Sequence, residues 1–178
     1  MVQIIELLGN KSGVKILSLF LKNPTLQTHQ KDIQKRVKLA KATLIRGINV
    51  LVENKILSFI RFGRTKVYSL NRKNKIVKHL KILDNLLLIS EIRDIVAEDA
   101  QMYLYGSSAR GEDVEDSDMD ILIIGKIRKE QIIQKINELS EKIRRKIKVE
   151  IFSPQEWSQM AKKDPAFYER VEKDKIEL

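Results

Sequence analysis

Gly106-Ser107-Ser108-Ala109-Arg110-Gly111, followed five residues later by Ser117-Asp118-Met119-Asp120, is the stretch of sequence that decides the fold of its half of the chain. It follows a short apolar run, residues 102–105, that reads as a β-strand, and it precedes a second run, residues 121–124. A glycine at the end of a strand lets the backbone turn sharply and approach a ligand closely. The amides after it would begin a short helix, and N–H groups at a helix start suit a phosphate. We therefore expect a strand, a phosphate-sized turn, a loop and a second strand.

Two carboxylates stand two positions apart where the second strand begins. Residues i and i+2 of a strand point to the same side, so Asp118 and Asp120 would repel each other unless a cation sits between them. Oxygen ligands suit Mg²⁺, which commonly binds few carboxylates together with substrate phosphates. The alternative is a solvated acidic loop, which describes well the four acids just before the pair: Glu112, Asp113, Glu115 and Asp116. It describes Asp118 and Asp120 poorly, because the apolar residues after them predict a buried strand.

This segment resembles the signature of the DNA polymerase beta-like nucleotidyltransferase superfamily, specifically of its minimal nucleotidyltransferases. The signature reads Gly-Ser, one residue, Ala-Arg-Gly, five residues, Ser-Asp, one residue and Asp. The chain matches it at Gly106, Ser107, Ala109, Arg110, Gly111, Ser117, Asp118 and Asp120. The resemblance covers roughly residues 98–155, and it implies a mixed β-sheet flanked by helices.

The resemblance also implies a two-metal transfer of a nucleotidyl group. Asp118 and Asp120 would bridge two Mg²⁺ ions, and an NTP, with ATP as the expected donor, would be attacked at its α-phosphorus. Gly106 and Ser107 would hold the triphosphate. Arg110 would either neutralise phosphate charge or pair with a neighbouring acid and shape the loop.

The family has a third carboxylate on a later strand. Glu150, within the alternating residues 148–152, is the candidate here, although aspartate is frequent at this place in the family. By resemblance, Glu150 would help to hold the ion that activates the attacking hydroxyl and would accept its proton. An exposed strand carboxylate is the other reading of this residue.

Charge divides the chain into two different halves. The net charge of the whole chain is +10, but residues 1–81 hold 18 Lys and Arg against 3 Asp and Glu, whereas residues 82–178 hold 16 against 21. Such asymmetry suggests two modules with different partners, and the basic one suits a polyanion.

The basic half shows helical spacing followed by strand spacing. Residues 13–22 predict a first helix, Thr28 would cap a second helix, and residues 41–53 repeat apolar positions at i, i+3, i+4 and i+7. Two alternating runs, residues 56–62 and 65–70, then flank Gly63-Arg64 and predict a β-hairpin.

Three helices and a hairpin resemble the winged helix-turn-helix family over roughly residues 11–72. In that family the third helix enters the DNA major groove and the hairpin contacts the backbone or the minor groove. The resemblance then implies a DNA-binding set on the third helix and the hairpin: Lys41, Thr43, Arg46, Arg61, Arg64 and Lys66. A protein-docking or dimerisation module is the alternative for such a fold, and the charge favours double-stranded DNA.

The expected fold class is therefore α+β with three parts. Residues 1–72 would form the winged helix-turn-helix domain, residues 73–97 a connecting amphipathic segment of one or two helices, and residues 98–178 the nucleotidyltransferase domain. The leucine-rich residues 86–89 would serve a domain interface, a dimer seam or packing within one domain.

We expect a DNA-binding nucleotidyltransferase that modifies an acceptor. Minimal members of the family often act in toxin–antitoxin pairs, so a small helical partner protein is one acceptor that the resemblance implies. The first alternative is a transcription regulator whose nucleotidyltransferase fold only binds or senses nucleotide. The second alternative is that the acceptor is a nucleic acid delivered by the basic half. This alternative fits less well, because the chain is too short to include a separate domain that grips a template or primer.

Composition sets the remaining expectations. The chain has no cysteine, no membrane-spanning apolar run and no signal peptide at its start, which together favour the cytoplasm. The oligomeric state stays open, with a homodimer as one option because winged-helix regulators often read paired half-sites.

Overall fold

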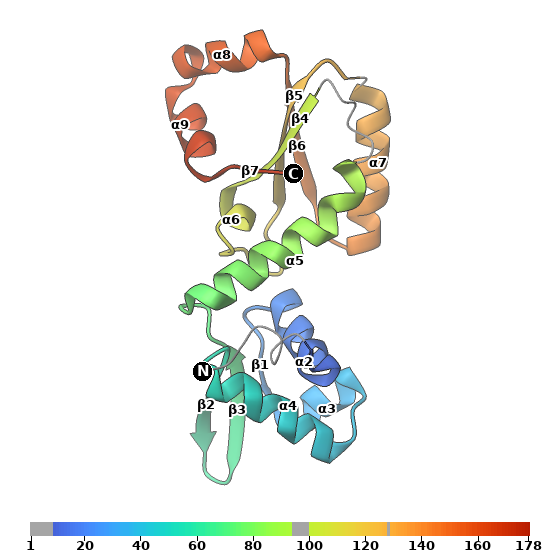
Figure 1. The fold of residues 1–178 in the computed structure, drawn as a ribbon, viewed down its shortest axis with the longest axis vertical. Helices are drawn as coiled ribbons and strands as arrows, with labels where there is room; N and C mark the ends of the chain where they lie inside the picture. The colour runs from blue at the N-terminus through green and yellow to red at the C-terminus, as the bar shows by residue number, and fades with distance from the viewer. Residues whose placement is uncertain (1–8, 94–99, 128) are drawn as a thin grey trace. The chain divides into compact units, whose positions relative to one another are not determined.

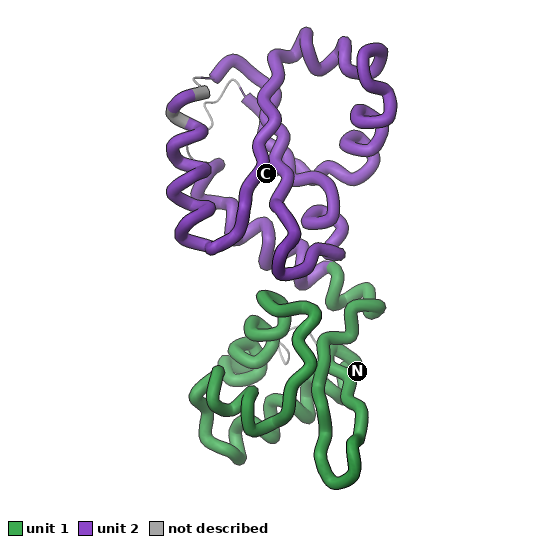
Figure 2. Tube along the Cα trace, turned by 180° about the vertical axis from the view of Figure 1, so that it is seen from behind, with its two compact units in different colours: residues 1–78 green, residues 79–178 purple. Residues whose placement is uncertain are grey.

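The computed structural model describes residues 9–93, 100–127 and 129–178. The chain divides into two compact units, Met1–Lys78 and His79–Leu178 (Figure 2). The boundary falls inside one helix, α5 (Lys75–Arg93), so the predicted connecting segment is a single helix as far as residue 93. Residues 94–97 of that segment lie outside the described part of the chain.

Between residues 9 and 74, the first unit contains the helices α2, α3 and α4 and a small antiparallel sheet (Figure 1). Its elements are α2 (Lys11–Lys22), β1 (Gln27–His29), α3 (Gln30–Val37), α4 (Lys41–Glu53), β2 (Leu57–Phe62) and β3 (Thr65–Leu70). The helices and the hairpin lie where the residue spacing predicts them. Asn10 begins α2 because its side chain accepts hydrogen bonds from the amides of Ser12 and Gly13.

One predicted start is wrong. Thr28 does not cap a helix: it lies in β1, opposite Tyr68 of β3, and its side chain is buried. The N-cap position of α3 falls on His29, which makes no capping bond with its side chain. The three-residue strand forms only because β3 offers it a partner, which explains why local spacing does not reveal it.

The second unit is built on a four-stranded mixed sheet, as expected. Its strands have the order β6-β5-β4-β7, in which β5 and β6 are parallel and the other pairs are antiparallel. Its elements after α5 are β4 (Ala100–Tyr105), α6 (Gly106–Ala109), β5 (Met119–Gly125), α7 (Lys129–Ile143), β6 (Ile147–Phe152), α8 (Pro154–Lys163), α9 (Pro165–Asp174) and β7 (Ile176–Glu177).

The two faces of this sheet pack against different helices (Figure 1). One face carries Met102, Leu104, Ile121 and Ile123, which pack with residues of α5 and α7 such as Ile92. The other face carries Tyr103, Tyr105, Leu122 and Ile124, and it packs with α8 and α9 through an aromatic group: Phe152, Trp157, Phe167 and Tyr168. Trp157 is buried there, as expected of a core residue.

The helix α8 begins with a capping box. Ser153 Oγ accepts from the amide of Glu156, and the Glu156 carboxylate accepts from the amide of Ser153. Asp164 then accepts from the amide of Phe167 and begins α9. The described ranges include no helix that is long and apolar enough to cross a membrane.

Candidate functional site

The turn after β4 has the shape that the sequence predicts. Gly106 has a φ of +71°, a backbone conformation that favours glycine. A Cβ atom at this position would lie 2.7 Å from Oδ2 of Asp120. Glycine is therefore needed twice, for the turn and for the approach of a carboxylate to it. The turn and the start of β5 are in direct contact.

Asp118 and Asp120 lie together, on the sheet face that packs with α8 and α9. Asp120 is paired across β4 with Tyr105 and across β6 with Lys148. The Lys148 ammonium is 2.6 Å from Oδ2 of Asp118, and this contact holds the pKa of Asp118 below its usual value. The same contact raises the pKa of Lys148.

Asp120 has the opposite electrostatic environment. Its partial burial is the largest cause of a raised pKa, and the neighbouring charge of Asp118 acts in the same direction. The charges of Lys148 and of Arg170, from α9, oppose this shift. Burial, with the charges of Asp120 and Glu150, also raises the pKa of Tyr105 to about 12. The tyrosine hydroxyl therefore stays protonated beside the carboxylates.

Glu150 lies on the same face but further along the sheet. Strand register sets Asp120 opposite Lys148 and Leu122 opposite Glu150, so Glu150 is displaced from Asp120 by one pleat repeat. No group of three His, Asp or Glu side chains that could hold a metal ion forms within residues 9–93, 100–127 and 129–178. The oxygen donors of Asp118 and Asp120, close together on one face, suit a single divalent cation that also binds substrate phosphates. Glu150 as a third ligand stays a prediction.

Arg110 forms ion pairs within the protein. Its Nη1 is 2.6 Å from Oδ2 of Asp174, near the end of α9, and its Nε is 3.1 Å from Oε2 of Glu112. Of the two sequence-based readings for Arg110, this geometry matches the one in which it pairs with neighbouring acids and shapes the loop.

Asp113 departs from the expected solvated loop. It is 1% exposed, and its Oδ2 lies 2.8 Å from both Lys81 Nζ and Arg145 Nη1. Asn85 donates to its Oδ1 at 2.9 Å. The acidic neighbours of Asp113 in the sequence give no sign of its burial, because the residues that neutralise it come from α5 and from the α7–β6 connection.

The first unit carries a concave surface beside the hairpin, with a volume of about 700 Å³. It is lined by residues of β1, α3, α4 and the hairpin: His29, Gln30, Lys31, Asp32, Ile45, Asn49, Arg64, Thr65, Lys66 and Tyr68. Of the six predicted DNA-binding residues, Arg64 and Lys66 belong to this lining, and Lys41, Thr43, Arg46 and Arg61 do not. Lys41, Arg46 and Arg61 are exposed, whereas Thr43 is half-buried.

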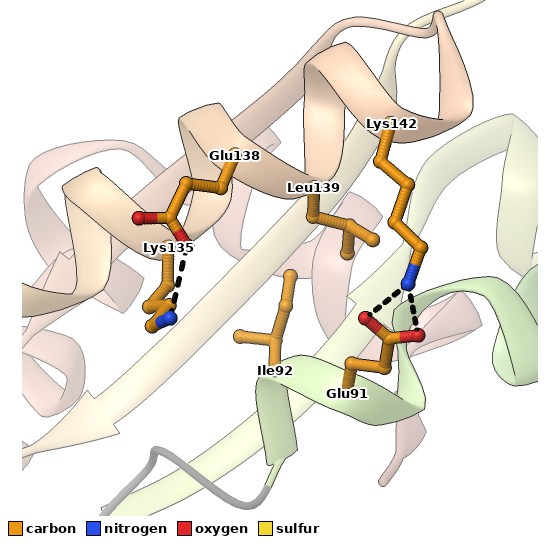
Figure 3. Close-up of a pocket in the computed structure, with 6 residues that line it drawn as sticks. All are labelled: Glu91, Ile92, Lys135, Glu138, Leu139 and Lys142. Atoms are coloured by element: carbon orange, nitrogen blue, oxygen red, sulfur yellow. Dashed lines mark hydrogen bonds and ion pairs between the residues drawn. The ribbon is translucent and has the colours of Figure 1, made fainter.

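A smaller cavity of about 300 Å³ lies between α5 and α7 (Figure 3). Two ion pairs, Glu91 with Lys142 and Lys135 with Glu138, lie on either side of Ile92 and Leu139. These helices cover the sheet face opposite to the carboxylates. The cavity therefore contains none of the predicted site residues.

Several residues of the site have no local signal in the sequence. Lys148 and Arg170 are charged residues of a strand and a helix like many others in the chain, and only tertiary packing brings them to Asp120. The sequence predicts Tyr105 only as the last residue of a strand. The register of β4 against β5 places it beside the pair.

Comparisons with known proteins agree with the C-terminal part of this description. Residues 89–176 match the family model of the nucleotidyltransferase domain, which confirms the expected domain type. A search of curated proteins finds no significant match.

Solved structures give weak likenesses. The crystal structure of Rv0081 from M. tuberculosis is 19% identical, with a TM-score of 0.41 over 52% of this chain and 89% of that one. A candidate nucleotidyltransferase from Sulfolobus solfataricus is 23% identical, with a TM-score of 0.32 over 58% and 84%. HmgR of Pseudomonas aeruginosa is 18% identical, with a TM-score of 0.35 over 68% and 50%. With TM-scores under 0.5, these likenesses carry no argument about fold or function.

Proposed function

Because residues 89–176 match a nucleotidyltransferase domain, we propose that the second unit transfers a nucleotidyl group from an NTP, with ATP as the expected donor, to a hydroxyl acceptor. The observation that carries the proposal is the contact between Gly106 and Asp120. A turn suited to phosphate and a pair of carboxylates suited to a divalent cation meet at one point.

The turn would receive the triphosphate. The first amides of a helix have no partner within the helix, and those of Ser107 and Ser108 occupy this position in α6. Lys148 and Arg170 place positive charge near Asp120, where it would balance charge on the phosphates. Arg110 is held by Asp174 and Glu112, so we assign it to the shape of the loop rather than to the phosphates.

Asp118 and Asp120 would hold Mg²⁺, with Glu150 contributing to a second ion. Mg²⁺ bound there would act as a Lewis acid on the phosphoryl oxygens. In the transfer, the acceptor oxygen forms a bond to the α-phosphorus, and the bond from that phosphorus to the bridging oxygen breaks. Pyrophosphate leaves with the electron pair, and the hydroxyl proton goes to the Glu150 carboxylate.

Label transfer tests this proposal. The protein would be incubated with ATP labelled at its α-phosphate, Mg²⁺ and candidate acceptors: a partner protein encoded beside it, RNA and small hydroxyl compounds. We expect label on one acceptor, and loss of at least about a hundredfold in rate for Asp118→Asn combined with Asp120→Asn. Asp116→Asn is the matched control, since Asp116 is an exposed acid of the same loop.

The result also separates the alternatives. ATP binding without transfer to protein, RNA or small acceptors would overturn the transfer proposal in favour of a nucleotide sensor. Label on a helical partner protein would fit a toxin–antitoxin pair, whereas label on nucleic acid would point to the basic unit as the part that delivers the acceptor.

For the first unit we propose a winged helix-turn-helix domain that binds double-stranded DNA. The concave surface between α4 and the hairpin supports this, because Lys31, Arg64 and Lys66 border it and Lys41 and Arg46 project from α4 nearby in sequence. Thr43, which is half-buried, would contribute less than the exposed residues. A homodimer reading two half-sites would fit this function.

Binding of a labelled duplex, followed by fluorescence anisotropy, tests the assignment. Lys41→Ala combined with Arg46→Ala should weaken binding at low salt by about tenfold or more. Unchanged affinity in this variant would remove α4 from the interface.

A further inference from the structure

The guanidinium group of Arg145 is enclosed by hydrogen-bond acceptors. Arg145 lies between α7 and β6, and its side chain is 11% exposed. Its Nε donates to Ser117 O at 2.7 Å, its Nη1 to Asn85 Oδ1 at 3.2 Å and to Asp113 Oδ2 at 2.8 Å, and its Nη2 to Ser108 Oγ at 3.0 Å and to Asp118 O at 3.4 Å. A guanidinium has five N–H groups, so this set accounts for all of its donors.

These contacts join two segments whose separation must stay fixed for the proposed reaction. Ser108 belongs to α6, directly after the Gly106–Ser107 turn, and the carbonyls of Ser117 and Asp118 lead the chain into β5. One planar group therefore bonds the phosphate turn and the backbone of a carboxylate residue at the same time. Because the fork is rigid, the separation of the two segments follows from its geometry.

The guanidinium is itself held in place by a buried network around Asp113. Asp113 is fully buried and binds both Arg145 and Lys81, while Asn85 donates to Asp113 Oδ1 at 2.9 Å and to Ser108 O at 3.0 Å. Rotation of Arg145 would leave the charge of Asp113 and the Asn85 carbonyl without this partner in the protein interior. Such losses are costly, so the arrangement is fixed.

We propose that Arg145 is a positioning residue that sets the distance between the Gly106–Ser107 turn and the Asp118 carboxylate, so that nucleotide and divalent cation bind cooperatively. The inference rests on the proposed function of the second unit. Arg145 touches neither ligand: it acts through Ser108 and through the backbone of Asp118.

Calorimetric titration with α,β-methylene ATP, with and without Mg²⁺, measures this cooperativity directly. In the intact wild-type chain, Mg²⁺ should tighten binding of the analogue by at least about tenfold. In Arg145→Met this gain should fall below about twofold, while the affinity measured without Mg²⁺ changes little, because the turn itself remains. Arg144→Met, a change of the exposed neighbouring arginine, should keep the wild-type gain.

Two smaller changes keep the test valid if Arg145→Met fails to fold. Arg145→Lys retains the charge but not the planar fork, and it should lose most of the gain. Ser108→Ala removes a single acceptor and should lose part of it, with a thermal midpoint near that of wild type.

The outcomes separate failure of the proposed nucleotidyl transfer from failure of the role assigned to Arg145. A wild-type protein that does not bind the analogue under either condition would overturn the proposed function. A wild-type gain from Mg²⁺ that survives intact in Arg145→Lys and Ser108→Ala would overturn the role of Arg145 and leave the proposed function standing.

Discussion

At the scale of single residues, Gly106 is where backbone geometry and site chemistry meet. Two of the glycines with a left-handed backbone make a matched pair: Gly106 at a φ of +71° and Gly63, in the hairpin turn, at +57°. A side chain at Gly63 would meet no atom within 4 Å, whereas one at Gly106 would meet Asp120 at 2.7 Å. The pair therefore separates backbone strain from obstruction of the site.

We expect Gly63→Ala to lower the free energy of unfolding by about 1 kcal/mol through backbone strain alone. Gly106→Ala should lower it further and should abolish binding of ATP, because Asp120 must move away from the turn. Urea unfolding and ATP titration of both variants provide the measurements. Equal effects of the two changes on both quantities would show that the contact with Asp120 is unimportant.

Replacing Asp118 or Asp120 by a neutral residue should change the stability of the folded protein in opposite directions. Burial raises the pKa of Asp120, so the folded state holds its proton more tightly than the unfolded chain and stability is lost as pH rises through that pKa. Contact with Lys148 lowers the pKa of Asp118, so its ionised form adds stability above the unfolded pKa that is lost as pH falls through the lowered pKa.

In the absence of divalent cations, Asp120→Asn should therefore raise the melting temperature at pH 7, and this gain should shrink in acid. Asp118→Asn should lower the melting temperature at pH 7, because it removes the ionised partner of Lys148. Melting curves between about pH 3 and pH 7 in a chelating buffer check the signs, since these limits lie below and well above the usual pKa of an aspartate, about 3.9. A lower melting temperature for Asp120→Asn at pH 7 would contradict the environment described for it.

At the scale of elements, the helix α8 depends on its first turn. Ser153→Ala removes the Oγ that accepts from Glu156, and we expect a loss of about 1 kcal/mol in the free energy of unfolding. Ser158→Ala, inside the same helix, removes a hydroxyl that donates only to the carbonyl of Gln155, and it should be nearly neutral. Chemical denaturation of both variants measures the difference, and equal losses would show that the cap does not stabilise the helix.

The elements that sequence spacing predicts are those with their own periodic pattern. The helices α2, α4 and α5 and the strands β2 to β6 fall in this group because apolar residues repeat along each of them. The short strands β1 and β7 were missed because pairing with β3 and β4 creates them. Alternation in β2 likewise predicts a strand but not its exposure: Ile60 and Phe62 are each 62% exposed near the hairpin tip.

The residues of the candidate site also divide into those with a local sequence signal and those placed by distant parts of the chain. Gly106, Asp118 and Asp120 could be found from spacing, since a turn and a strand start are local features. The environment of Asp113 could not, because Lys81 and Arg145 approach it from distant parts of the chain. The same holds for Lys148, whose contact with Asp118 depends on the register of β6 against β5.

At the scale of the whole molecule, the unequal charge of the two halves has a measurable consequence. If five cations of the first unit contact phosphates, the logarithm of the DNA affinity should fall against the logarithm of the salt concentration with a slope of about −4 to −5. Lys41→Ala with Arg46→Ala should reduce the steepness by about 2. Lys162→Gln with Lys163→Gln removes the same charge from α8 and should leave the slope unchanged, so equal changes in both would indicate binding through net charge alone.

The helix α5 limits where the chain can be cut without harm to the second unit. The segment recognisable as a nucleotidyltransferase domain starts at residue 89, after Lys81 and Asn85, which neutralise and bond Asp113. Recombination at that point would transplant a buried aspartate without its lysine and amide partners. A fragment that keeps these partners has to begin before Lys81, as the second unit does at His79, inside α5. The family match and the second unit therefore begin at different residues, and a fragment cut at residue 89 loses the lysine and the amide that stabilise Asp113, whereas one cut at His79 keeps them.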